Sequence, residues 1–458
     1  MKEKFFLLLL LVPVFFISCS KQGFVTDPAA VISYADTVRF DTVFTSIGSI
    51  TKHFAIVNSN DQKLRISSVK LMGGSQSAFK INIDGQPVAQ VDNIELEAGD
   101  SVYVFVSVTV DPSSGATPFL IKDSIGIGYN GNTVYTQLEA YGQNAHFLKD
   151  HVVGEDTQWE NDLPYVISGG LYVEEGAALT IEKGCRIYMH ANAPVLVNGS
   201  LIVNGTAEER VIMQGDRLDR GYKDLPASWP GIVFSASSHN NHLRFGVIKN
   251  AYQAITTVGP SAGASPKLKL NQCVVDNIYD TGLLAYGSEI EAVNCLISNC
   301  GANIYLAGGT YNFTHCTISS FNNTYFNHTR PLVFLTDTYE NVSNVELNAT
   351  FKNCIIWGDG SVVENEIRTE KKGNAGFNIL LDHTLYGTQQ TPPEAEEINC
   401  IVNQDPLFDS IDVVRKIFDF RLQAASPAIG AGDAAGITID LDNNTRTGEA
   451  DLGCYAKP

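Results

Sequence analysis

The sequence predicts an all-β protein in which a small antiparallel domain precedes a longer parallel one. The chain of 458 residues contains 39 glycines and few runs of strong helix formers, a composition typical of β proteins. Short alternating runs of apolar and polar residues occupy the part before residue 148, and a recurring motif occupies the part after residue 160. With 44% hydrophobic residues, the chain can fill more than one core.

The N-terminus is predicted to be a lipoprotein signal peptide covering residues 1–18. A basic start precedes the apolar stretch from Phe5 to Ile17, which is a secretion signal and not a membrane span. Phe16 to Cys19 resemble a bacterial lipobox, in which the cysteine becomes the lipidated N-terminus. The resemblance implies diacylglycerol and palmitate on Cys19 and an anchor in the outer membrane, where each buried methylene contributes about 0.8 kcal/mol.

Residues 19–33 are expected to be a flexible tether between this anchor and the first domain. The residues after Cys19 lack an acidic run, so the choice between the periplasmic face and the cell surface stays open. The formal net charge of the chain is −19. This charge argues against a nucleic-acid partner, because phosphate binding needs a basic surface.

The region from residue 34 to 148 is predicted to be a β-sandwich. Six alternating runs follow one another there at intervals of about ten residues, separated by Gly, Asn, Asp and Pro turns, as is typical of a sandwich. The six runs are Phe40 to Phe44, His53 to Val57, Leu64 to Ile66, Phe79 to Ile83, Ser101 to Val110 and Asp123 to Ile127.

Part of this region is similar to a known kind of domain. Asp41 to Gly48, Phe54 to Asn58 and Leu64 to Ile66 resemble the immunoglobulin-like domains of the hydin type found in bacterial envelope proteins. The resemblance implies a spacer or adhesive module, and it carries no catalytic residues over.

A cysteine motif recurs five times in the second half of the chain. Each copy places a polar residue before the cysteine and an aliphatic pair close behind it, at Cys273, Cys295, Cys316, Cys354 and Cys400. The steps are 22, 21, 38 and 46 residues, so a unit of about 20 to 25 residues recurs with additions, as in a solenoid. A coil of a parallel β-helix has that length, and stacking at about 4.8 Å would place the cysteines in an interior ladder.

The stretch before these cysteines supports the same fold. Short strands broken by glycine run from Val166 to Met213, and they resemble the N-terminal coils of right-handed parallel β-helix proteins, whose fold also carries the pectate lyases. We expect the β-helix to span residues 160–425, with insertions near 320–347 and 360–397. Residues 426–458 are expected to be a C-terminal cap, because an uncovered last coil exposes strand edges.

Eight cysteines remain after Cys19 in an exported chain, which by default suggests disulfides. An interior ladder competes with that explanation and favours free buried thiols. Cys295 and Cys300 flank a turn and are the pair to examine first. A zinc site is not expected, because the chain has no Cys-x-x-Cys pair.

Carboxylates on the coils form the first candidate for chemistry. Polysaccharide lyases on this fold use carboxylates to hold Ca²⁺ and a nearby Arg or Lys as the base. No Arg or Lys lies between Lys269 and Arg330, so the base would have to be Arg330. Turn aspartates and solvated strand residues are the structural alternative. The remaining candidates for catalysis are Asp276, Asp280, Glu289, Glu291 and His315.

A second candidate is a Ca²⁺ loop near the C-terminus. Asp440, Asp442, Asn444 and Asp451 alternate like the ligands of such a loop, although Thr445 stands where an EF-hand needs glycine. A turn with Asx hydrogen bonds is the alternative. Apart from this possible Ca²⁺, the sequence predicts no cofactor.

Aromatic residues around the first insertion form the third candidate. Aromatic faces beside amide donors suit sugar rings, whereas stacked aromatics are also ordinary β-helix core. The residues predicted to bind a ligand are Tyr286, Tyr305, Tyr325, Phe326 and His328.

Together these features predict an outer-membrane-anchored lipoprotein whose β-helix is a non-catalytic binding or adhesive module for a glycan or an envelope protein. The alternatives are a polysaccharide lyase or glycoside hydrolase, and a structural subunit of an outer-membrane complex. A base clustered with carboxylates between Asp276 and Arg330 would favour the enzyme. A broad exposed apolar patch on the sandwich would favour the complex.

Overall fold

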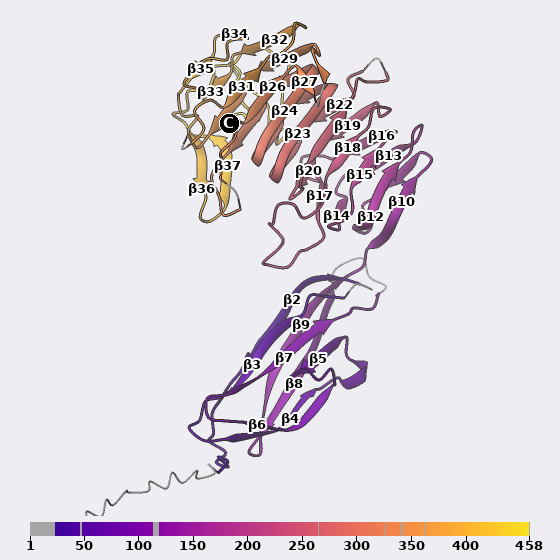
Figure 1. Cartoon of the computed structure of the whole chain (residues 1–458), viewed down its shortest axis with the longest axis vertical. Helices are drawn as coiled ribbons and strands as arrows, with labels where there is room; N and C mark the ends of the chain where they lie inside the picture. The colour runs from indigo at the N-terminus through magenta and orange to yellow at the C-terminus, as the bar shows by residue number, and fades with distance from the viewer. Residues whose placement is uncertain are drawn as a thin grey trace, which may run out of the picture. The chain divides into compact units, whose positions relative to one another are not determined.

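The computed structural model describes residues 23–45, 48–112, 119–263, 265–325, 327–339, 342–360 and 362–457. The predicted lipidation site Cys19 and the predicted ligand residue Phe326 lie outside these ranges. The chain divides into two compact units, the first ending at Gln143 and the second beginning at Asn144 (Figure 1). Within the described ranges the only helical element is the short 3-10 turn η1 (Gly74–Gln76). None of these residues forms a helix long and apolar enough to span a membrane.

The first unit is a sandwich of two sheets around one core. One sheet has four strands, in the order β1 (Ile32–Ser33), β3 (Lys52–Asn58), β7 (Ser101–Val108) and β5 (Phe79–Ile83). The other has five, in the order β2 (Thr37–Phe44), β9 (Asn132–Gln143), β8 (Phe119–Tyr129), β4 (Leu64–Leu71) and β6 (Gln90–Leu96). Only the β2–β9 pair is parallel among these pairings.

Alternation explains how the sandwich strands form. In β7, Val104 and Val106 are fully buried while Tyr103 and Phe105 face solvent, because successive side chains of a strand point to opposite faces. All six predicted runs are strands in the structure, and β6 and β9 are two long strands not among them.

The tether prediction is wrong for residues 23–33. Val25 donates a backbone hydrogen bond to Lys63, and Ile32 pairs with Asn58 at the edge of β3. Ala30 and Ile32 are buried in the sandwich core. The burial of these two apolar side chains attaches the segment to the domain.

The second unit is a parallel β-helix with three faces, whose strands form one sheet of 24 strands. The first face holds the starts of β10 (His146–Val153), β12 (Tyr165–Val173), β23 (Val274–Val293) and β24 (Leu296–Thr314), together with β14 (Arg186–Met189), β17 (Val211–Gly215), β20 (Gly246–Lys249), β25 (Thr317–Ser320), β30 (Ile355–Gly358), β33 (Leu385–Tyr386) and β35 (Ile401–Val402).

The second face holds the ends of β10 and β12 and the middle parts of β23 and β24, together with β15 (Val195–Val197), β18 (Ile232–Phe234), β21 (Ile255–Val258), β26 (Val333–Thr336) and β31 (Ile367–Glu370). The third face holds β11 (Thr157–Trp159), β13 (Ala178–Glu182), β16 (Ser200–Asn204), β19 (Asn241–Arg244), β22 (Leu268–Asn271), the ends of β23 and β24, β29 (Leu347–Lys352), β32 (Phe377–Asp382) and β34 (Ala395–Ile398).

The cysteine ladder is confirmed. The residues after three of the cysteines are in register on adjacent coils, Val274 with Leu296 and Leu296 with Thr317. Burial raises the pKa of the thiols of Cys273, Cys295 and Cys316 well above the usual range. All eight described cysteines are free, so Cys295 and Cys300 are not bonded.

The polar residue before each cysteine has a backbone role. Asn294, His315 and Asn353 have φ angles of 51°, 51° and 55°, in the left-handed region that asparagine tolerates better than most residues. This conformation turns the chain at the corner between the third and first faces. The motif therefore combines a corner with a small inward side chain.

The insertion predicted near 360–397 is wrong as a description of that stretch. Leu385 pairs with Ile355 on one side and with Ile401 on the other, so a complete coil lies between Cys354 and Cys400. Thr384 takes the place of the cysteine in that coil, donating its hydroxyl proton to the Phe351 carbonyl. The 46-residue step between Cys354 and Cys400 therefore contains two corners. It resembled one expanded coil because the residue at the cysteine position of the first corner is Thr384.

The stretch from 320 to 347 is only partly an insertion. It contains β26, which pairs with both β24 and β31 in the parallel sheet. The added parts are a loop of residues 321–332 and a two-stranded hairpin of β27 (Thr338–Tyr339) and β28 (Val342–Ser343).

Both predicted ends of the β-helix shift. The helix begins earlier than residue 160, because β10 already pairs with β12. Residues 403–457 include the hairpin of β36 (Phe408–Asp412) and β37 (Ile417–Leu422), and they cover the outer side of the first face (Figure 1). The reason is a separate apolar cluster in which outward residues such as Leu296 and Ile355 pack against Phe408 and Leu452. The predicted cap is thus largely a side cover.

Candidate functional site

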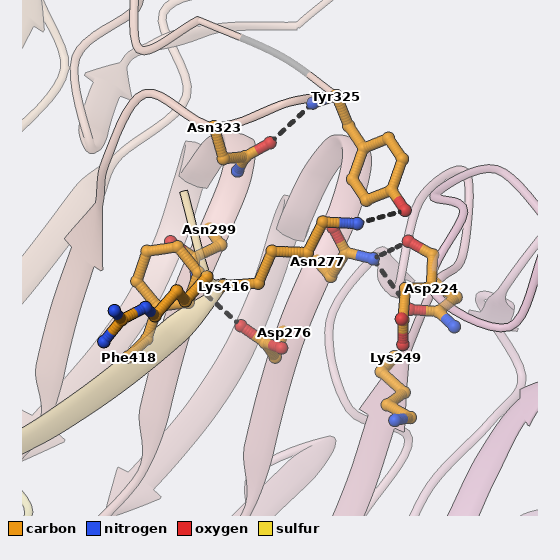
Figure 2. A pocket seen from close by; sticks show the side chains of 11 residues that line it. Asp224, Lys249, Asp276, Asn277, Asn299, Asn323, Tyr325, Lys416 and Phe418 are labelled. Carbon is orange, nitrogen blue, oxygen red and sulfur yellow. Dashed lines mark hydrogen bonds between the residues drawn. The ribbon is translucent and has the colours of Figure 1, made fainter. Parts of the chain in front are cut away.

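A pocket of about 270 Å³ lies where the first face turns toward the second. Four segments enclose it: the ends of the first-face strands, the loop between β17 and β18, the turn of the β36–β37 hairpin, and the loop after β25 (Figure 2). The lining residues are Asp224, Lys249, Asn250, Asp276, Asn277, Asn299, Asn323, Tyr325, Arg415, Lys416 and Phe418.

Asparagines make the floor of this pocket. Asn250, Asn277 and Asn299 follow the first-face strands with φ angles of 63°, 57° and 50°. Asn277 donates to Asn250 Oδ1 at 2.8 Å and to the Asp224 carbonyl at 2.8 Å. The ladder of amides thus turns each coil and holds the β17–β18 loop against the pocket.

Asp276 is half-buried beside this floor. Its Oδ1 accepts hydrogen bonds from the Ser298 hydroxyl at 2.7 Å and from Asn299 Nδ2 at 3.0 Å. Burial raises the pKa of Asp276, against the opposing effects of these hydrogen bonds and the charge of Lys249. A carboxyl group with a raised pKa in a pocket is typical of functional sites.

Asn299 contributes a buried acceptor that has no partner among the described residues. Its side chain is buried and its Nδ2 is committed to Asp276, which fixes the orientation of the amide. Its Oδ1 has no hydrogen-bond partner within the described part of the chain. A buried unpaired carbonyl costs free energy unless a ligand or water donates to it.

The aromatic wall comes from distant segments. Lys416, at the tip of the β36–β37 hairpin, donates to the Tyr325 hydroxyl at 2.6 Å and lies 4.1 Å from the centre of that ring. Phe418 adds a second, partly buried ring from the same hairpin. Figure 2 shows the Lys416 side chain reaching from the hairpin toward Tyr325.

Of the predicted catalytic residues, only Asp276 lines this pocket. Asp280 accepts from Arg330 at 2.8 Å and from Gln253 at 2.9 Å, and these contacts lower its pKa although burial opposes them. Arg330 is exposed, with 58% of its side chain accessible. The pair is a surface ion pair and lies outside the pocket lining.

The other carboxylates and the histidine belong to other parts of the coil. Glu289 and Glu291 lie on the third face, where Glu291 approaches Lys269 at 3.5 Å. His315 is buried at the corner before Cys316, with Nε2 3.0 Å from Asn353 Nδ2. Burial, assisted by the charge of Arg446, lowers the pKa of His315 to about 3.

The predicted ligand-binding aromatics divide between sites. Tyr325 lines the pocket, whereas Tyr286 and Tyr305 contact each other on the second face with ring centres 6.3 Å apart. His328 is buried and its Nε2 lies 3.1 Å from both carboxylate oxygens of Glu366. Tyr286 and Tyr305 are diagonal neighbours on adjacent coils, with their rings edge to face.

The predicted Ca²⁺ ligands are engaged in turns and ion pairs. Asp440 Oδ1 accepts from the backbone of Asp442 and Asn444 at 2.9 and 2.8 Å. Asp442 pairs with Arg210 at 3.1 Å, and Asp451 accepts from the Gly430 backbone at 2.8 Å. These contacts are those of an Asx turn in the side cover, and the Ca²⁺ site stays a prediction.

One other group of described residues has the donor types of a metal site. Ligand atoms of Asp382, His383 and Asp433 lie within 4.8 Å of one another. Lys352 already pairs with Asp382 at 3.0 Å and with Asp433 at 2.7 Å. This ammonium supplies the positive charge that the two carboxylates need.

Sequence reasoning missed Lys249, Lys416, Asn299 and Phe418. Asp276-Asn277 and Ser298-Asn299 were visible as turn formers, so the recurrence of asparagine after each first-face strand was a usable signal. No local signal connects Lys416 and Phe418 to the pocket, because the hairpin reaches it only through packing on the first face.

Comparisons with known proteins concern the fold. Residues 151–260 match the family model described as pectate-lyase like beta helix domain. No curated protein matches the chain.

The solved structures that are similar include three of different kinds. A family 123 glycoside hydrolase from Clostridium perfringens is 8% identical, with 26% of this chain and 31% of that chain covered and a TM-score of 0.19. The Vibrio cholerae VesB protease is 12% identical, with 24% and 31% covered and a TM-score of 0.18. PapD-like domain 7 of human CEP192 is 10% identical, with 31% and 100% covered and a TM-score of 0.19.

The chain spans 31% of the length of each of the first two. The family match is consistent with the register of the strands. The matched residues 151–260 lie within the parallel β-helix, and the same sheet continues beyond them to β35.

Proposed function

We propose that this protein is a lipid-anchored envelope protein whose β-helix binds a glycan in the pocket around Asp276. A β-helix domain fits a carbohydrate-related or adhesive module. The fold by itself does not choose a ligand, so the proposal depends on the chemistry of the pocket. The anchor at Cys19 and the outer-membrane location rest on the lipobox resemblance alone.

The observation that carries the proposal is the pairing of an aromatic wall with a polar floor. The rings of Tyr325 and Phe418 stand with a row of side chains, Asp276, Asn277 and Asn299, in one pocket. Sugar rings present an apolar C–H face and several hydroxyl donors, which match such a wall and such acceptors.

Binding and chemistry can be tested together. The chain lacking residues 1–22 is passed over immobilised neutral and acidic polysaccharides, and both retention and released reducing or unsaturated ends are measured. We expect retention without product release, and about tenfold weaker retention for Tyr325→Ala. Tyr135→Ala is the control, because Tyr135 is a similarly exposed tyrosine on the sandwich and does not line the pocket. Equal retention of both variants and the unchanged chain would contradict the proposal.

An enzyme is the second candidate, and one observation favours it. Lys249 and Lys416 line the same pocket as Asp276, so the basic groups missing between Lys269 and Arg330 are supplied from an earlier coil and from the hairpin. A lysine beside a carboxyl group of raised pKa is a possible base and acid pair. Release of unsaturated ends, lost in Lys249→Met or Lys416→Met, would establish a lyase in place of a binding module.

A further inference from the structure

A second cavity, of about 500 Å³, opens on the same face of the β-helix. Asp276, Ser298, Ser319 and Trp357 occupy one register position on four successive first-face strands, so this cavity lies on the row that begins at the first pocket. Its lining residues are Trp357, Gly358, Gly360, Val363, Glu364, Glu366, Gly387, Thr388, Gln389 and Asn403.

A buried carboxylate stands at the base of this cavity. Glu366 is 3% exposed and lines it. Behind it, His328 is 1% exposed and places Nε2 3.1 Å from both Glu366 oxygens. The two oxygens of a carboxylate offer about four acceptor positions, so the contact with one ring nitrogen leaves Glu366 able to accept from a ligand.

Two glycines create the space around this carboxylate. A Cβ on Gly358 would lie 2.2 Å from Glu366 Oε1 and 2.4 Å from His328 Nε2, so only glycine admits the pair at that position. A Cβ on Gly387 would lie 3.5 Å from both Glu366 Cγ and the Trp357 ring. The absence of a side chain at Gly387 therefore keeps open the space between the carboxylate and the indole.

The remaining walls are polar and ordered. Asn403 accepts from the Thr388 backbone at 2.9 Å and donates to the Thr388 carbonyl at 2.7 Å, which holds its amide in place. Among the described residues that line the cavity there is no Lys or Arg, whereas Glu364 and Glu366 are both present. The negative charge of these two glutamates disfavours an anionic ligand. The Trp357 indole, beside oxygens that can accept hydrogen bonds from hydroxyl groups, favours a neutral sugar.

We infer that this cavity is a second sugar site, in which Trp357 stacks on a neutral sugar residue and Glu366 accepts from its hydroxyls. The inference deepens the proposed function and rests on it. Three coils separate Asp276 from Trp357, about 14 Å at ~4.8 Å per coil, so a chain of several sugars contacts both sites. One loop serves both sites, since Asn323 and Tyr325 line the first pocket and His328 supports Glu366.

The test compares Gly387→Ala, Glu366→Gln and Trp357→Ala, each made in the chain lacking residues 1–22. Gly387→Ala meets only ordinary van der Waals distances, so it fills the space without unfolding the protein. Gly221→Ala is the matched control, because a Cβ there has no neighbour within 4 Å. Thermal unfolding followed by circular dichroism confirms that each variant is folded before binding is measured.

The probes are short and long neutral cello-oligosaccharides on a glycan array that also carries other neutral and acidic oligosaccharides. We expect each of the three variants to bind the long neutral glycans about tenfold more weakly, with short glycans held at the first pocket unaffected. Binding equal to that of the unchanged chain in Gly387→Ala and Trp357→Ala would overturn the second site and leave the proposed function standing. Failure of the unchanged chain to bind any glycan would overturn both.

Discussion

The sheet strands of the two units pair over very different sequence distances. In the sandwich, Arg39 bonds to Glu139 across 100 residues, and β2 pairs with β9 from the other end of the domain. In the β-helix, Ser298 bonds to Asp276 only 22 residues away, and this pattern is repeated from coil to coil. A solenoid of this kind gains its stability from neighbouring coils, whereas a sandwich depends on the whole domain.

The difference also governs where binding sites can form. Each β-helix coil presents the same positions to solvent, so a row such as Asp276, Ser298 and Trp357 extends along one face. Loops added between coils then enclose parts of the row, as residues 321–332 and the β36–β37 hairpin do. The described strands of the sandwich show no such row, since its sheets pair segments that share no repeat.

The two units can be observed separately in experiments. The tryptophans are Trp159, Trp229 and Trp357, all in the second unit. The eight described cysteines also belong to it. Tryptophan fluorescence and thiol labelling therefore follow the β-helix alone, and amide exchange at β7 follows the sandwich.

The largest effect is expected at Gly231, in the corner before β18. Its φ is +116°, and a Cβ there would lie 1.5 Å from the Gln253 carbonyl oxygen. Gly231→Ala should destabilise the β-helix by more than about 4 kcal/mol. The denaturation midpoint followed by tryptophan fluorescence should fall, while the amides of β7 stay protected from exchange. Gly85→Ala in the sandwich, at φ +82° with no neighbour within 4 Å, should cost only about 1–2 kcal/mol. Similar losses of unfolding free energy in Gly231→Ala and Gly85→Ala would contradict this expected difference between the two units.

A matched core deletion tests how far damage spreads. Ile56 in the sandwich and Ile297 in the β-helix are both fully buried, and each change to Ala should cost about 2–5 kcal/mol. We expect Ile56→Ala to lower the exchange protection of the entire sandwich. Ile297→Ala should lower protection mainly in the coils around β23, β24 and β25. Uniform loss across the β-helix would show that it unfolds as cooperatively as the sandwich.

The next effect concerns acid stability and belongs to the β-helix. His315 has a pKa of about 3 in the fold because of burial, against about 6.5 in an unfolded chain. The unfolded state therefore takes up a proton first, and stability should fall by up to ~1.4 kcal/mol per pH unit as pH decreases from 6.5 toward 3. His315→Asn copies the corners at Asn294 and Asn353 and should remove this loss.

The measurement for His315→Asn is the tryptophan-monitored denaturation midpoint at several pH values. His53→Asn is the control, because His53 is exposed on the sandwich and should leave the β-helix curve unchanged. An identical pH dependence in the unchanged chain and His315→Asn would rule out this histidine as the cause.

The smallest effect is expected at Asp276. Burial raises the pKa of Asp276, so the fold favours the protonated carboxyl group more than the unfolded chain does. As pH rises through the folded pKa, the ionised carboxylate lowers the stability of the fold. Asp276→Asn should therefore stabilise the β-helix slightly at neutral pH, by about 1 kcal/mol or less, and should leave the sandwich unaffected. Loss of stability at neutral pH would show that the ionised carboxylate is needed for the fold.

Much of the β-helix could be predicted because its local rules repeat. An asparagine or histidine in the left-handed region followed by a small inward residue identifies a corner, as at Asn294-Cys295. Counting cysteines missed one corner, because His383-Thr384 follows the same rule with threonine in place of cysteine. In the sandwich, alternation predicted β7, whereas β9 was not predicted, because no repeat marks its position.

The candidate site was predictable only in part. Asp276 and Tyr325 were named from the sequence, and the structure places them in one pocket. Glu289 and Tyr286 were also named, yet the 20-residue strand β23 passes through all three faces, so they point elsewhere. Neighbours in sequence diverge because each corner turns the chain to another face.

The sequence by itself determined that this chain is all-β, that its second half is built from stacked coils, and that its cysteines face inward. These features follow from short-range steric preferences and from the burial of small apolar side chains, which act within one coil. Only the tertiary structure decided which residues share a site. Lys416 reaches Tyr325 because apolar packing brings the side cover onto the first face. His328 reaches Glu366 because the stacking of coils brings distant residues together. Neither contact has a local sequence signal.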